Sequence, residues 1–128
     1  MKYLQVVQAA QAIESIQQLR LPYAKARKIY EISKKLRCEY EFYANEEAKL
    51  VNEYAVKGEN GRPIIRENGM ITFPDLEAKE AYSHEILKLN EMFVEMRIEP
   101  VTLTAAEIGT QTIQPEAISR LEGIIIFE

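Results

Sequence analysis

The sequence is short of the residues on which several classes of protein depend. Its 128 residues include one cysteine, Cys38, one histidine, His84, no tryptophan and five glycines. A single cysteine forms no internal disulfide, so packing has to stabilise the fold. The glycines are scattered and form neither GxGxxG nor GxxxxGK[ST], which excludes nucleotide binding through those loops. We therefore expect neither a disulfide framework nor a phosphate-binding loop.

Long apolar runs are also missing. The longest, Ile124 to Phe127, is far shorter than the roughly 20 residues of a membrane-spanning helix. Gln interrupts the N-terminal segment, so no signal-peptide core forms there. The composition, 47% apolar and 28% charged, is typical of a globular protein. We expect a single cytoplasmic domain, residues 1–128, with no contact to a membrane.

Residues suited to metal or acid–base chemistry occur without the partners that this chemistry needs. His84 follows Glu80 by one helical turn, but a metal site normally takes three or four ligands. Cys38 has basic neighbours, yet nothing identifies a base or an oxyanion site beside it. The acids Glu46 and Glu47 are adjacent, but spacing alone does not show whether two carboxyl groups face each other across a cleft, and a solvated face is the default. We predict no catalytic residue, no metal site, no cofactor and no enzymatic activity.

Charge is present in quantity and is unevenly distributed. The net charge of the chain is −4. Residues 1–57 carry ten Lys and Arg against seven Glu, a net +3, whereas residues 58–128 carry six basic against thirteen acidic residues, a net −7. Most of the positive charge lies between Arg20 and Arg37, where Glu31 is the one acid. This basic segment is the strongest electrostatic feature of the sequence.

Three segments have the periodicity of amphipathic helices. They are residues 4–20, 22–57 and 75–97, and the first two meet at Leu21-Pro22. In the second segment, apolar residues recur every seven positions at Ile29, Leu36, Tyr43 and Leu50, as in a coiled coil. Ser33 and Glu47 interrupt the adjoining seam, which favours packing inside a small bundle over a free-standing rod. We predict an antiparallel helical hairpin or three-helix bundle.

Turn residues and β-branched residues predict the remaining elements. Asn60-Gly61 and Asn68-Gly69 favour tight turns, and the second is flanked by apolar runs, which predicts a β-hairpin over residues 62–73. The tail, residues 98–128, reads as strand, short helix and strand, with 98–103 paired to 124–127. The predicted fold class is α+β, mainly α, with a β-hairpin and a small two-stranded C-terminal element.

A basic stripe on the second helix is the main candidate for binding. Arg27 and Lys34 share one heptad position, and Lys28 and Lys35 share the next, so the four cations line one side of the helix. They could track phosphates, but the acidic pI of about 5.2 and the lack of a nucleic-acid motif argue against this function. We expect the basic stripe to contact an acidic protein, or the acidic third helix of another copy, and the chain to form a homo-oligomer.

The predicted hairpin is a second candidate. A ribbon between two helices needs no ligand to explain it, but functional residues concentrate in loops. If the hairpin does bind a partner, its contact residues are Arg62, Arg66 and Asn68.

The order of segments resembles that of a group of small phage and prophage proteins of unknown function. The residues that carry the resemblance are LP…KARKIYEISKKL, YAVKGENGRPIIRENG, FPDLEAKEAYSHEILKLNEMFVE and IEPVTLTAAEIG…IQPEAISRLEGIIIF. The group offers no catalytic residues. The resemblance implies a phage product in the bacterial cytoplasm or in the virion.

Three functions follow as hypotheses from this resemblance together with the basic stripe. The first is an accessory protein that binds and modulates a host protein of transcription or antiviral defence. The second is a structural or assembly component of the phage head or tail, and the third is a nucleic-acid-binding accessory protein.

Overall fold

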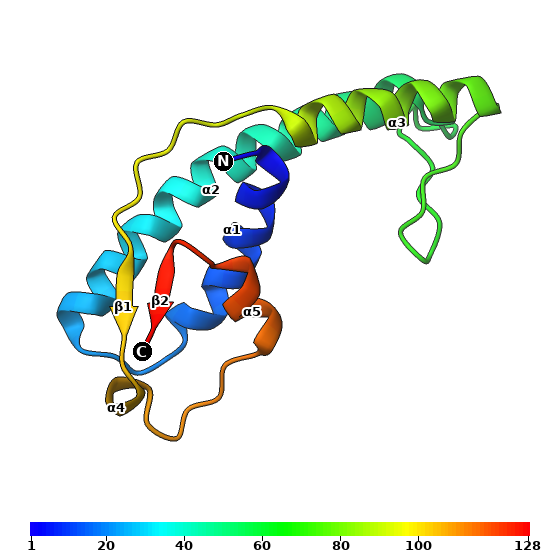
Figure 1. Ribbon diagram of the computed structural model, residues 1–128. Helices are drawn as coiled ribbons and strands as arrows, with labels where there is room; N and C mark the ends of the chain where they lie inside the picture. Colours follow the sequence, from blue (N-terminus) through cyan, green and yellow to red (C-terminus); the bar gives the residue numbers. More distant parts are fainter. The chain divides into compact units, whose positions relative to one another are not determined.

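The computed structural model describes residues 1–128 and is mainly helical, with one small sheet (Figure 1). Its elements are α1 (Tyr3–Gln17), α2 (Tyr23–Tyr54), α3 (Leu76–Glu91), β1 (Val101–Leu103), α4 (Ala105–Ile108), α5 (Pro115–Arg120) and β2 (Ile125–Phe127). The chain divides into two compact units, one of residues 1–40 with 93–128 and the other of residues 41–92. The mainly helical α+β class predicted from the sequence is confirmed.

The first unit has a core built on one face of α1. Val6, Ala9, Ile13 and Ile16 are buried at three- and four-residue steps. The sequence periodicity predicted Val6, Ile13 and Ile16 on this face, but it placed Ala10 there in place of Ala9. α1 packs against α5 (Figure 1) and is joined to α2 by two side-chain hydrogen bonds. Tyr3 Oη donates to Glu39 over 2.7 Å, and Ser33 Oγ donates to Gln17 over 3.2 Å. Ser33, which interrupted the apolar seam in the sequence, is therefore buried with a polar partner.

The corner between α1 and α2 forms where the sequence predicted it. Leu19 N donates to Ile16 O as α1 ends, and Pro22 O accepts from the amides of Lys25 and Ala26 as α2 begins. Pro22 suits this position because its fixed φ fits the start of a helix. α2 then runs for 32 residues without interruption, which confirms the long helix.

The tail forms a two-stranded sheet whose strands are parallel (Figure 1). The register pairs Val101 with Ile125 and Leu103 with Phe127, so the predicted pairing of the two segments is confirmed. The predicted strand over 98–103 is shorter than expected and begins at Val101. Parallel strands need a long crossover, and α4 and α5 supply it.

Residues 62–73 do not form the regular β-hairpin predicted from the sequence. Both Asn-Gly turns are present, with Gly61 and Gly69 at φ 73° and 78°, but the only bridge across the second turn joins Ile65 and Ile71. The ladder does not extend because another segment takes its hydrogen bonds: Val56 O accepts from Ile64 N, and Val56 N donates to Thr72 O.

The third helix is also shorter than predicted. α3 begins next to its predicted cap, Asp75, whose carboxylate accepts from Ala78 N over 2.7 Å. It ends at Glu91, before the predicted limit of residue 97. The segment that follows is extended, and Val94 exchanges two backbone hydrogen bonds with Met1. The apolar periodicity continued past Glu91, but pairing with the N-terminus ended the helix there.

Candidate protein-binding surface

The four cations of the basic stripe are all exposed on α2, but the structure places them in two settings. Arg27 and Lys34 flank the ring of Tyr30, whereas Lys28 and Lys35 line a pocket of about 100 Å³ with Glu31 and Glu99. Lys35 Nζ also donates to Arg97 O over 3.1 Å. The second pair therefore lies beside two carboxylates of its own chain, and Arg27 of the first pair also forms a salt bridge with one of them, Glu31, over 3.4 Å. The first pair differs from the second by the exposed ring that it contacts.

Tyr30 organises the outward face of α2. The Arg27 guanidinium carbon lies 5.5 Å from the centre of its ring and Lys34 Nζ lies 5.6 Å from it, both within cation–π range. Tyr30 is 44% exposed, and Tyr23, two turns before it, is 94% exposed. We call Tyr23, Arg27, Tyr30 and Lys34 the aromatic–cation stripe. Their spacing of four, three and four residues places them on one face of the helix.

Sequence reasoning found the two cations of this stripe and missed its two tyrosines. The signal was present, because Tyr23 and Tyr30 are seven residues apart and share a helical face with Arg27 and Lys34. Tyrosine and arginine are the residues that most often dominate binding energy at protein interfaces. The stripe thus combines large exposed rings with cations whose positions the ring contacts restrict.

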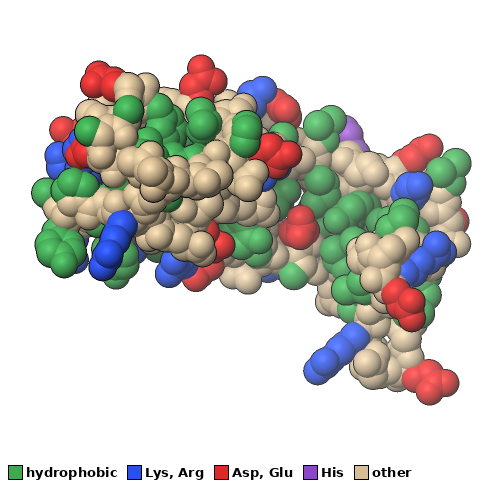
Figure 2. All heavy atoms as spheres, turned by 90° about the horizontal axis from the view of Figure 1, so that it is seen from below, with side chains coloured by type: hydrophobic (Ala, Val, Ile, Leu, Met, Phe, Trp, Pro, Cys, Tyr) green, Lys and Arg blue, Asp and Glu red, His purple; other side chains and the backbone are tan.

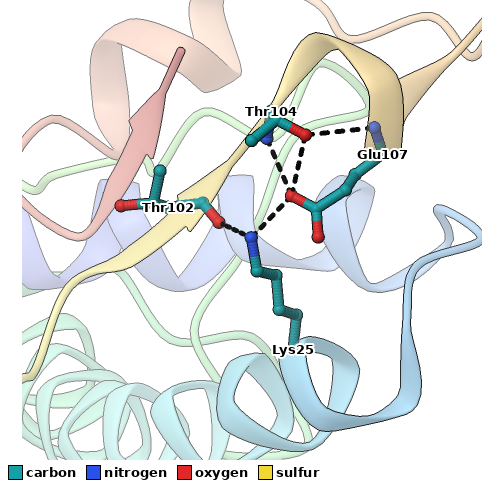
Figure 3. A network of polar contacts seen from close by, with 4 residues as sticks. All are labelled: Lys25, Thr102, Thr104 and Glu107. Carbon is teal, nitrogen blue, oxygen red and sulfur yellow. Dashed lines mark hydrogen bonds and ion pairs between the residues drawn. The ribbon is translucent and has the colours of Figure 1, made fainter.

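One lysine of the basic segment is fully engaged inside the first unit. Lys25 Nζ donates to Glu107 over 2.5 Å and to Thr102 O over 2.5 Å (Figure 3). Thr104 and Glu107 complete the predicted capping box at the start of α4, with Thr104 N donating to the same carboxylate. The hydrogen bond from Lys25, followed by the one from the Thr104 backbone, lowers the pKa of Glu107. This network ties α2 to the sheet and removes Lys25 from the binding surface.

The hairpin residues predicted as contacts lie in the second unit and differ in their roles. Asn68 Oδ1 accepts from Met70 N over 3.0 Å, so its side chain stabilises the turn. Arg62 is exposed in the first turn. Arg66 Nε donates to Thr72 Oγ1 over 3.2 Å and lies at the edge of a groove. Of the three, Arg66 alone combines a free charge with a neighbouring cavity.

That groove lies between the turn region and α3, and sequence reasoning did not identify it. It has a volume of about 570 Å³ and is lined mainly by apolar side chains, among them Met70, Phe73, Leu76 and Tyr82. Figure 2 shows apolar side chains gathered on this unit, with Lys and Arg side chains at the edge. The rings of Phe73 and Tyr82 lie 5.1 Å apart. Burial, followed by the charge of Glu47, raises the pKa of Tyr82.

The residues considered for metal or nucleophilic chemistry are not gathered into a site. No group of three or more His, Cys, Asp and Glu side chains has a geometry that would hold a metal ion. His84 is exposed on α3, and Cys38 is exposed on α2. None of the helices has the length and apolar content needed to cross a membrane.

The chain was compared with models of known families, with curated proteins and with solved structures, and it matches none of them.

Proposed function

We propose that this chain is a protein-binding protein without catalytic activity, and that its aromatic–cation stripe contacts an acidic surface of its partner. The observation that carries the proposal is Tyr30, a half-exposed ring held between Arg27 and Lys34 next to the almost fully exposed Tyr23. A partner that covers these rings removes apolar surface from water, and its carboxylates pair with the two cations.

Electrostatics favours an acidic protein as the partner. The salt bridge between Arg27 and Glu31, at 3.4 Å, joins two exposed side chains and is therefore weak. The Arg27 guanidinium still has donors to offer to a second carboxylate. The positive charge of residues 1–57 would speed encounter with a negatively charged surface.

The biological setting of the proposal rests on the resemblance of the sequence to small phage and prophage proteins. On that basis the partner is a bacterial protein, such as a component of transcription or antiviral defence, and the role of the chain is to modulate it. The aromatic–cation stripe lies on α2 alone, and its geometry is independent of this setting.

The test is capture from a bacterial lysate with a matched pair of variants. Tyr30→Ala removes the central ring of the stripe, and Phe42→Ala, on the same helix and 43% exposed, removes a ring of similar exposure outside it. We expect the wild type and Phe42→Ala to recover one acidic protein in near-equal amount. Tyr30→Ala should weaken that binding by about 2 kcal/mol, roughly thirtyfold, as loss of an interface hot spot does.

Two results would contradict the proposal. Equal recovery of the partner by Tyr30→Ala and the wild type would show that the stripe is not part of the interface. Recovery of phage structural proteins alone, from infected cells, would reject a host partner. Mass spectrometry of purified particles then shows whether the chain is a virion component.

A further inference from the structure

α3 exposes a face whose chemistry mirrors that of the aromatic–cation stripe. None of its residues is buried, and Leu76 and Leu87 are 69% and 58% exposed. These leucines are eleven residues apart, three helical turns, so they lie on the same side of the helix. Glu77 and Glu80 are exposed on or beside that side. We call Leu76, Glu77, Glu80 and Leu87 the acidic α3 face.

The two surfaces match in pattern as well as in charge. On α2, Tyr23 is followed by a cation four residues later, and on α3, Leu76 is followed by a carboxylate four residues later. The stripe from Tyr23 to Lys34 and the face from Leu76 to Leu87 both span eleven residues, about 16 Å of helix. Each surface therefore offers apolar side chains next to charges of mainly one sign, over the same length. The exceptions are Glu31, which pairs with Arg27 of the stripe, and the exposed Lys79, which lies between Glu77 and Glu80.

This inference rests on the proposed function. We propose that, while no host protein is bound, the aromatic–cation stripe contacts the acidic α3 face of a second copy of this chain, so that self-association and binding of the host protein exclude each other. Apolar contact between tyrosines and leucines is flanked by pairing of Arg27 and Lys34 with Glu77 and Glu80. A second copy is the occupant to which the structure points, because the chain itself carries an exposed face of mainly opposite charge and equal length, with two leucines 69% and 58% exposed.

The contact joins two different surfaces, the stripe of one copy and the acidic α3 face of another. Because each copy carries one of each, a twofold pair makes the contact twice, whereas a head-to-tail arrangement makes it once between successive copies. Self-association should therefore grow with concentration. It should weaken as NaCl rises from about 0.1 to 1 M, because the Debye length falls from about 10 to 3 Å.

A charge-exchange experiment tests the contact with three variants. Arg27→Glu/Lys34→Glu makes the stripe acidic, and Glu77→Lys/Glu80→Lys makes the α3 face basic, so each variant alone has two surfaces of like charge. The third variant combines all four substitutions and restores opposite charges in exchanged positions. Light scattering and analytical ultracentrifugation measure association from about 1 to 100 µM, the range expected for contacts of modest area.

We expect the wild type to associate and each two-residue variant to associate at least about tenfold more weakly, since several charge pairs change sign. Mixing the two variants, or combining the four substitutions in one chain, should restore association. Because Glu77→Lys places a cation in the first turn of α3, circular dichroism checks that the helix is retained. Leu87→Ser, which changes no charge, should also weaken association.

A wild type that stays monomeric over this range, or two-residue variants that associate as the wild type does, would overturn the inference. Failure here is distinguishable from failure of the proposed function. Suppose that the wild type is monomeric but binds an acidic bacterial protein, and that Tyr30→Ala binds this protein less well. The proposed function would then stand, and only the second copy as occupant of the stripe would be rejected.

Discussion

At the scale of single residues, Tyr3 shows how burial and one polar partner change the pKa of a side chain. Its side chain is buried in the first unit, and its hydroxyl donates to Glu39 over 2.7 Å. Burial, then the hydrogen bond to Glu39 and the charge of that carboxylate, raise the pKa of Tyr3 to about 12. The folded state thus holds the phenol proton more tightly than the unfolded chain, whose tyrosine titrates near the ordinary value of 10.0.

Tyr3 should make the stability of the fold fall in alkali. Because the pKa of Tyr3 is raised on folding, the protonated phenol stabilises the fold. This stabilisation is complete when the pH is below the unfolded pKa of 10.0, and it is lost as the pH rises from 10 to about 12. At pH 8, Tyr3→Phe should lower the free energy of unfolding by about 1–3 kcal/mol, because it removes a hydrogen bond to a charged acceptor. Urea unfolding at several pH values should show this difference shrinking above pH 10. A difference that stays constant up to pH 12 would contradict the assignment.

The candidate site shows which residue roles a sequence reveals. Arg27 and Lys34 could be found by counting charges at heptad spacing. Lys25 belonged to the same basic segment of the sequence, and nothing local showed that Glu107 and Thr102 would bind it, because both lie more than 70 residues away in the chain. Tyr30 was first assigned no function, and the structure distinguishes it through its exposure and its two cation contacts.

At the scale of elements, the sevenfold ridge of α2 is not uniformly covered. Ile29, Leu36 and Tyr43 are buried, whereas Leu50 is half-buried. The sequence pattern is the same at all four positions, so the difference comes from the elements that pack against each part of the helix. Leu36 lies within the first unit and Leu50 within the second.

This difference gives the second prediction, which compares matched truncations on one helix. Leu36→Ala should destabilise the fold by about 2–5 kcal/mol, because Leu36 is 0% exposed and its loss leaves a cavity. Leu50→Ala should cost about 1 kcal/mol, because part of its side chain already contacts water. Urea unfolding followed by circular dichroism measures both. Equal losses would show that the ridge is covered evenly along α2.

The elements that departed from prediction did so where hydrogen bonds came from a distant segment. Asn68-Gly69 predicted a turn correctly, but Val56 took the backbone partners that a regular hairpin would have used. Likewise α3 has its predicted cap at Asp75, and its end was set by Val94 pairing with Met1. Local preferences act over a few residues and therefore predict caps and turns better than they predict where a ladder or helix stops.

At the scale of the whole molecule, the two units differ in how much they bury. Nearly all of the buried side chains belong to the first unit, while Tyr43 and Ala55 are those of the second. The second unit has a hydrogen bond of 2.6 Å from Tyr43 to Asn90, but no residue of α3 is buried. A unit with so few buried apolar side chains opens more easily, because opening exposes little additional apolar surface.

The third prediction concerns hydrogen exchange. The backbone amides of α3 should exchange faster than those of α1, which has six buried residues. Exchange followed by mass spectrometry measures both helices in one sample, and the dilute sample keeps self-association small. Protection of α3 equal to that of α1 would contradict the difference in burial.

The sequence by itself determined the long helix α2, the corner at Pro22, both Asn-Gly turns and the caps at Asp75 and Thr104, because each depends on residues within a few positions. It also placed Arg27 and Lys34 on one face of α2. Only the tertiary structure decided that β1 and β2 run parallel and that Lys25 pairs with Glu107. It also decided that Tyr30 stays half-exposed beside two cations. These outcomes depend on which distant segments compete for the same hydrogen bonds and the same buried surface, and no short-range pattern contains that information.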